Sequence, residues 1–250
     1  MNKVSVVIAA RNEAKNLSVC LPALRGLTED VLIIENQSTD DTVTVAQHLG
    51  ARVISTEWKG YSATKNWGIT QASYDWIFSL DADEEADEVL IDSIRDLFLH
   101  EPDKHCVFSV QRKMVYGQQV LHYGAVSKEY RVRLFHRETA LWDDHEVHEE
   151  LFYSVPVKVI KLKGCLWHHS YTSEREHQER LTKYARLSAQ QMKASGKRIA
   201  FWKPMCSPAF HFVKNYFFRL GFLDGKMGYR FARNEMQYVH QKYQMLRALD

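Results

Sequence analysis

The chain has 250 residues, of which 45% are apolar and 26% charged, and its 33 Lys and Arg side chains nearly balance 31 Asp and Glu, for a formal net charge of +2. This composition excludes collagen-like, disordered and disulfide-framework proteins, and the length indicates one large domain or one domain with an appendage. A dedicated nucleic-acid-binding protein would carry a strong basic excess, so the near-neutral total argues against nucleic acid as a partner.

The charges are unevenly distributed along the chain. Residues 199–250 hold eight Lys or Arg and three Asp or Glu, whereas residues 1–198 hold 25 basic and 28 acidic side chains. The same C-terminal segment contains twelve of the thirty aromatic residues. We therefore expect two parts, a main domain at residues 1–198 and a basic, aromatic, helical extension at residues 199–250.

Cysteine spacing and apolar run lengths bear on the cellular compartment. The four cysteines are far apart and show no CxxC spacing, which favours reduced thiols in a cytoplasmic protein. The apolar run from Val4 to Ala10 is too short for the core of a signal peptide. The sequence contains no stretch of about 18 uninterrupted apolar residues, so we expect no membrane-spanning helix.

Short apolar runs alternate with amphipathic stretches over the first 80 residues. The runs VSVVIA, VLIIE, ARVIS and DWIFSL predict strands at residues 4–9, 31–35, 51–55 and 75–80. Helical spacing predicts helices at residues 14–27, 42–49 and 61–72. Because β-branched runs that alternate with helices are typical of βαβ units, we expect an α/β protein with a mainly parallel sheet flanked by helices.

The pattern changes in the second half of the chain. Residues 106–166 alternate apolar and polar positions, which predicts half-exposed antiparallel or mixed strands. Helical spacing returns later and predicts helices at residues 174–195, 209–220 and 229–249.

Acidic side chains follow the strand predicted at residues 75–80. Ligands of open α/β sheets bind beyond the carboxyl ends of the strands, where Asp81 and Asp83 lie. Two carboxylates one residue apart suit Mg²⁺ or Mn²⁺, which combine carboxylate oxygens with phosphate oxygens. The sequence therefore predicts a metal site for a nucleoside diphosphate. The alternative is a solvated turn, or a cap for the helix that begins near Asp87.

Polar residues also follow the first two strands. Glu35 ends the second strand, where a carboxylate can accept a hydrogen bond from a base or a ribose hydroxyl. Arg11 and Lys65 supply positive charge for phosphate groups. Ser38 and Asp40 are expected to cap the helix that begins at residue 42.

Five segments occur in an order that resembles glycosyltransferase family 2, the nucleotide-sugar-dependent enzymes of the GT-A fold. The segments are VSVVIAARNE, VLIIENQSTDDT, WKGYSATKNWGI, DWIFSLDADEE and HEVHEEL. Within the family, residues 1–195 resemble bacterial enzymes that add a sugar to the inner core of lipopolysaccharide or lipooligosaccharide. The resemblance implies that Ala9, Arg11 and Glu13 line the nucleotide site and that Glu35 meets the base.

The same resemblance assigns the donor and metal contacts. The WKGYSATKN segment implies that Lys65 and Asn66 face the donor diphosphate and sugar. Asp81 and Asp83 match the metal-binding DxD, with Asp83 as the direct ligand, and His168 in LWHHSY is the candidate third ligand. A packed, hydrogen-bonded histidine is the alternative for His168.

Transfer with inversion requires a base on the face of the donor sugar opposite the leaving group. Relatives carry Val-His-Glu where this chain has HEVHEEL, which implies that Glu149 is the base, with Glu146 and Asp144 as alternatives. An exposed acidic loop is the structural alternative for this segment.

The sequence thus predicts an inverting, metal-dependent hexosyltransferase that uses Mg²⁺ or Mn²⁺. The resemblance implies UDP-glucose as the donor and a lipid-linked inner-core glycan as the acceptor. The basic, aromatic extension predicts peripheral contact with the anionic inner leaflet of the cytoplasmic membrane, although its aromatics can equally pack on the body or on a partner subunit.

Two other functions remain open from the sequence. A polyprenyl-phosphate glycosyltransferase would also use a basic, aromatic membrane surface, and its anionic acceptor needs no base. A non-catalytic, sugar-nucleotide-binding membrane adaptor would bind the donor without turnover.

Overall fold

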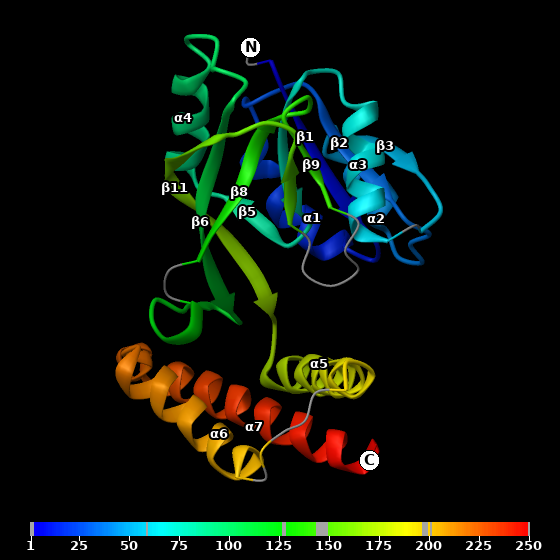
Figure 1. Ribbon diagram of the computed structural model, residues 1–250. Coiled ribbons are helices and arrows are strands. Elements are labelled where there is room, and N and C mark those ends of the chain that lie inside the picture. Colours follow the sequence, from blue (N-terminus) through cyan, green and yellow to red (C-terminus); the bar gives the residue numbers. More distant parts are fainter. Residues whose placement is uncertain are drawn as a thin grey trace. The chain divides into compact units, whose positions relative to one another are not determined.

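The computed structural model describes residues 3–58, 60–126, 129–143, 150–196, 200 and 202–249. The chain forms two compact units (Figure 1). The first comprises Met1–Arg112 and Glu129–His168, and the second comprises Lys113–Lys128 and His169–Asp250.

The first unit is built on a sheet with strand order β3-β2-β1-β4-β8-β6-β11-β5. Its parallel part has β1 (Val4–Ala10) between β2 (Val31–Glu35) and β4 (Trp76–Asp81), with β3 (Arg52–Ser55) beside β2. The four predicted strands are therefore confirmed within one residue. The β-branched side chains of β1 and β2 are buried on both faces of the sheet, whereas the edge strand β3 is only partly buried.

Antiparallel strands extend the sheet beyond β4. β8 (Glu129–His136) pairs with β4 and with β6 (Cys106–Tyr116), and β11 (Lys158–Tyr171) pairs with the short edge strand β5 (Glu84–Ala86). A separate hairpin joins β9 (Ala140–Trp142) to β10 (Leu151–Tyr153). The predicted mixed strands of this region are confirmed.

Helices cover both faces of the sheet, as predicted for an α/β protein (Figure 1). One core joins the strands to α1 (Ala14–Cys20), η1 (Pro22–Leu24), α2 (Thr42–His48) and α4 (Glu88–Leu97). The other core joins them to α3 (Tyr61–Gln71) and β9. The helix predicted over residues 14–27 is wrong in extent: it stops before Pro22, because proline lacks the amide hydrogen that continues an α-helix.

Two glycines of the first unit allow close packing against helices. A Cβ atom at Gly68 would lie 2.6 Å from Ile34 Cγ1, so any larger residue would push α3 away from β2. A Cβ atom at Gly164, whose φ is +86°, would lie 2.3 Å from the amide nitrogen of Leu90. Gly68 thus allows α3 to pack closely on β2, and Gly164 allows β11 to pass close to the first turn of α4.

The second unit is mainly helical. It contains α5 (Glu174–Ala194), α6 (Lys203–Val213), the π-helical turn η3 (Lys214–Phe218), η4 (Gly221–Asp224) and α7 (Gly225–Leu249), together with β7 (Gln119–Val120) and η2 (Gly124–Val126). α6 begins six residues before the predicted residue 209, because Pro204 fits the first turn of a helix. The domain boundary expected between residues 198 and 199 lies outside the described residues and stays a prediction.

Aromatic side chains of the second unit divide between its interior and its surface. Inside, the His177 ring is fully buried and stacks on Phe231 at 5.2 Å between centroids. Outside, α6 and η3 leave Phe210, Met205 and Phe218 exposed by 63%, 73% and 77%. Among the described helices, none combines the length and the apolar content that a membrane crossing requires.

Candidate active site

The carboxyl ends of β1, β2 and β4 meet at one edge of the sheet. In the strand ladders Ala9 lies opposite Asp81, and Ala10 lies opposite Glu35. Glu35 is buried, and its carboxylate accepts a hydrogen bond from the backbone N–H of Ser38. Three of the predicted site residues, Ala9, Glu35 and Asp81, are thus brought together by the register of the parallel strands.

The loops after β1 and β2 are bonded to each other through Asn12. The Oδ1 atom of Asn12 accepts from the N–H of Thr39 at 2.7 Å, and the N–H of Asn12 donates to Ser38 Oγ at 3.1 Å. Asn12 has a φ of +57°, which asparagine tolerates better than most residues. Asn12 lies in the VSVVIAARNE segment, but no role was predicted for it; an asparagine at a strand-to-helix turn is a weak signal for such a conformation.

The helix cap predicted for Ser38 and Asp40 is wrong in part. Asp41 occupies the N-cap position of α2 and makes no side-chain cap. Asp40 does accept from the N–H of Thr42 at 3.1 Å, but it also accepts from the N–H of Ala14, at 3.2 Å. Because these side chains bond across to the β1 loop, they hold two strand ends together as well as one helix end.

The two charged residues predicted in the β1 loop have different surroundings. Arg11 is exposed to solvent. Glu13 is half-buried: its N–H donates to Thr42 Oγ1 at 2.8 Å, and its carboxylate accepts from Asn16 Nδ2 at 2.6 Å. The β1 loop therefore places the long, charged side chain of Arg11 at the surface, and a hydrogen bond from Asn16 holds the carboxylate of Glu13 in place.

Asp81 lies between two buried cations. Its Oδ1 atom is 2.9 Å from Lys65 Nζ and its Oδ2 atom is 2.6 Å from Arg133 Nη2. Lys65 and Arg133 are each only 4% exposed. Burial opposes ionisation of Asp81, but the charges of Arg133 and Lys65 outweigh it and hold the pKa of this carboxyl well below its usual range. Asp81 is therefore a carboxylate with both oxygens already occupied.

The ion pairs continue from Arg133 to the neighbouring strands. Glu84, which is fully buried, lies 2.5 Å from Arg133 Nη2 and 3.6 Å from Arg112 Nη1. Arg112 in turn donates two hydrogen bonds to Glu129. Of these residues the sequence indicated only Asp81 and Lys65, because Arg133 lies in an alternating strand whose polar positions are normally exposed.

Asp83 contacts His168. The Oδ2 atom of Asp83 is 3.2 Å from Nε2 of His168, and both side chains are partly exposed. The contact follows from topology, since Asp83 precedes β5 and His168 lies opposite Glu84 in the β5–β11 ladder. Residues 85 apart in the sequence thus form one carboxylate–imidazole pair at the sheet edge.

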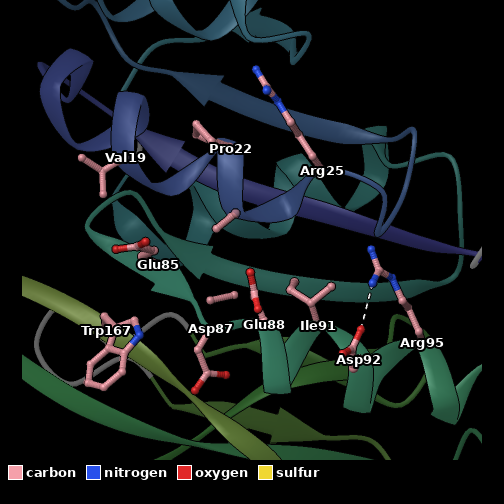
Figure 2. Close-up of a pocket in the computed structure, with 12 residues that line it drawn as sticks. Val19, Pro22, Arg25, Glu85, Asp87, Glu88, Ile91, Asp92, Arg95 and Trp167 are labelled. Atoms are coloured by element: carbon pink, nitrogen blue, oxygen red, sulfur yellow. Dashed lines mark hydrogen bonds and ion pairs between the residues drawn. The ribbon is translucent and has the colours of Figure 1, made fainter.

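A surface groove lies on the other face of the β5–β11 pair. It has a volume of about 670 Å³ and runs between η1 and α4, with Glu85 and Trp167 at one end and Arg25 and Arg95 at the other (Figure 2). Successive side chains of a strand point to opposite faces. Trp167 and Glu85 therefore face the groove, whereas their neighbours His168 and Glu84 face the Asp81–Arg133 cluster.

Among the described residues, no group of three or more His, Cys, Asp and Glu side chains is arranged to hold a metal ion. Of the predicted metal set, Asp83 and His168 contact each other, whereas Asp81 contacts Lys65 and Arg133; the metal role of all three stays a prediction. The predicted base Glu149 and its alternatives Glu146 and Asp144 lie outside the described residues.

Asn66 is bonded to the backbone on both sides of Trp142. Its Nδ2 donates to the Trp142 carbonyl at 2.8 Å and its Oδ1 accepts from the Trp142 N–H at 2.9 Å. Lys65 Nζ lies over the Trp142 ring, 4.5 Å from its centroid. α3 therefore fixes the end of β9, from which the HEVHEEL segment departs.

We expect the substitution Asn66→Ala to release the backbone of Trp142. Loss of the Oδ1 acceptor leaves the Trp142 N–H without its hydrogen bond, so hydrogen exchange at this amide should accelerate at least tenfold. Peptide-resolved exchange measured by mass spectrometry checks this. Thr70→Ala, one turn later on α3 and exposed, is the control and should leave that amide unchanged. Equal protection in both variants would contradict the assignment.

Comparison with known proteins agrees with this geometry. The family Glycosyl transferase family 2 matches residues 5–159. An uncharacterised glycosyltransferase of Rickettsia typhi is 27% identical over 92% of this chain and 81% of its own length. The lipopolysaccharide core biosynthesis glycosyltransferase LpsC of Rhizobium meliloti is 29% identical over 86% of this chain and 80% of its own length.

A solved structure shares the fold. Residues 1–349 of S. aureus TarS, in complex with UDP, superpose with a TM-score of 0.50 over 97% of this chain and 91% of that chain, at 16% identity. With the family match over more than half of its length, the chain belongs to glycosyltransferase family 2, the nucleotide-sugar glycosyltransferases.

Proposed function

We propose that this chain transfers a hexose, glucose from UDP-glucose, to an inner-core lipopolysaccharide or lipooligosaccharide acceptor with inversion at the sugar. The observation that carries the proposal is the Asp83–His168 pair at the edge where β1, β2 and β4 end. The acceptor is suggested by the name of the LpsC relative, and the nucleotide by the UDP bound to TarS.

The nucleotide occupies the ends of β1 and β2 in this proposal. Glu35 and Ala9 stand at that edge, where the ladders pair Glu35 with Ala10 and Ala9 with Asp81. Glu13 and Arg11 flank it from the β1 loop, where the exposed guanidinium of Arg11 can approach a phosphate. Lys65, which contacts Asp81, contributes positive charge at the same edge.

Mg²⁺ or Mn²⁺ is the metal that the Asp83–His168 pair fits. A carboxylate oxygen and an imidazole nitrogen in mutual contact can turn to one cation. Mg²⁺ is commonly held by one or two carboxylates together with substrate phosphates, and the softer Mn²⁺ accepts an imidazole nitrogen more readily than Mg²⁺ does. Both oxygens of Asp81 already accept from cations, which favours Asp83 as the direct ligand. When bound, the cation neutralises charge on the departing nucleoside diphosphate.

Glu149 is the proposed base, with Glu146 and Asp144 as alternatives. Inversion needs a group that takes the proton from the acceptor hydroxyl while positive charge develops on the donor ring. The described residues on either side of this segment are held together, since the N–H of Asp143 donates to the carbonyl of Glu150 at 2.9 Å. The two described ends of this segment are therefore adjacent.

The Asp83→Ala variant should lose transfer without losing its fold. Charge stabilisation by a bound metal is worth several kcal/mol, so we expect a rate at least about a hundredfold lower with UDP-glucose and Mn²⁺. Lipooligosaccharide from cells that lack this chain should miss one hexose by mass, and the wild type but not the variant should restore it. Asp92→Ala, an exposed acid of α4, is the control. Full activity of Asp83→Ala would refute the metal assignment.

Glu149→Gln separates the inner-core acceptor from a polyprenyl phosphate. A hydroxyl acceptor needs a base, and loss of a general base lowers kcat by about 10²–10⁴-fold. The measurement is the transfer rate to the core acceptor at saturating donor. Glu150→Gln, the exposed neighbour, should retain the wild-type rate. Undiminished turnover of Glu149→Gln would favour an acceptor that is already an anion.

The second unit contacts the anionic inner leaflet in this proposal. Exposed apolar side chains of α6 and η3, with Phe218 the most exposed, enter the headgroup layer, while Lys214 and Arg219 on the same segment meet anionic lipid. This places a protein on the membrane surface, where a lipid-linked glycan acceptor is held. The exposed aromatics and the local positive charge together support a lipid surface over packing on the body.

The double variant Phe210→Ser/Phe218→Ser should bind vesicles more weakly. Burial of one Phe side chain is worth about 1.5–3 kcal/mol, so partial insertion of two predicts a loss of affinity of about tenfold or more. Cosedimentation with phosphatidylglycerol–phosphatidylethanolamine vesicles measures it. Tyr184→Ser, half-exposed on α5, is the control. Unchanged binding would contradict the proposal, and dimerisation through the same face would indicate a partner subunit instead.

A further inference from the structure

We infer that Arg133 is a positioning residue for the proposed metal site, and the inference therefore rests on the proposed function. Arg133 lies on β8 and binds the carboxylates of Asp81 and Glu84, which stand at the two ends of the turn that carries Asp83. Through this bridge it fixes the Asp83 carboxylate against His168.

The turn between β4 and β5 is short and strongly acidic. β4 ends at Asp81 and β5 begins at Glu84, so only Ala82 and Asp83 connect them. Within this turn the N–H of Asp81 donates to Glu84 Oε2 at 3.2 Å. Three carboxylates within four residues repel one another at close range, and a cation between two of them removes that repulsion.

Arg133 is placed to supply that cation. Its Nη2 atom lies 2.6 Å from Asp81 Oδ2 and 2.5 Å from Glu84 Oε1. Arg133 is 4% exposed and Glu84 is fully buried, so solvent screens the contact between them little, whereas the Asp81 side chain is 32% exposed. Asp81 and Glu84 outweigh the burial that acts against the charged form, and they raise the pKa of Arg133. The bridge is therefore a largely buried set of ion pairs that closes the turn.

The bridge reaches the metal site through the strand ladder. Glu84 is the residue of β5 that lies opposite His168 in β11. A shift of Glu84 would therefore disturb the strand pairing of His168, and it would also displace Asp83, the preceding residue in the chain. Groups that orient metal ligands in this way typically change metal affinity or activity by about 10–100-fold when substituted.

Mn²⁺ binding to the full chain tests the inference without relying on turnover. Free Mn²⁺ is measured by electron paramagnetic resonance in the presence of UDP, for the wild type, Arg133→Gln and Arg133→Lys. We expect Arg133→Gln to raise the Mn²⁺ concentration for half-occupancy about 10–100-fold, and Arg133→Lys to recover part of the loss because it keeps the charge. Arg131→Gln is the matched control, since Arg131 lies two residues away on β8, is exposed and pairs with Glu129.

The outcomes separate the inference from the function on which it rests. Circular dichroism and thermal unfolding establish that each variant is folded, and Glu84→Gln replaces Arg133→Gln if the latter fails to fold. Half-occupancy within about twofold of the wild type in a folded Arg133→Gln or Glu84→Gln overturns the inference alone. Absence of Mn²⁺ binding by the wild type overturns the proposed metal site and, with it, the role of Arg133.

Discussion

Asp81 ends the central parallel part of the sheet with a carboxylate between two cations that are almost completely buried. A buried charge is costly unless it is paired, so Lys65 and Arg133 each need an anionic partner, which Asp81 supplies to both and Glu84 supplies to Arg133 as well. Lys65, Asp81 and Arg133 come from α3, β4 and β8, which are distant in sequence. The requirement for charge pairing thus joins three elements at the edge where the strands end.

The parallel half of the fold was predictable because its signal is local. Runs such as VLIIE are buried on both faces, and no other short element has that composition. The edge residues Ala9, Glu35 and Asp81 followed from it, since the carboxyl ends of parallel strands meet at one edge. The boundary of α1 was less predictable: helical spacing continued past Pro22, and only the missing amide of that proline ends the helix.

The contacts within the site could not be predicted from the sequence. Arg133 belongs to the strand EYRVRLFHR, where alternation assigns every second residue to solvent, yet Arg133 is buried and Arg131 is exposed. The side-chain amide of Asn66 bonds the backbone of Trp142 through both its nitrogen and its oxygen, a pairing that the sequence did not indicate. In both cases the partner is more than 45 residues away, and a pattern over neighbouring residues carries no information about such a pairing.

The many aromatic residues of residues 199–250 fall into a buried group and an exposed group, which composition alone does not distinguish. Phe231 and Tyr243 of α7 are buried and belong to the interior of the helical unit. Phe210 and Phe218 remain exposed on α6 and η3, beside the cations of the same segment. Because an exposed aromatic loses hydrophobic stabilisation unless something covers it, only the second group calls for a partner. An anionic lipid surface would cover the aromatic rings and meet the cations at once, which neither a neutral protein face nor bulk water does.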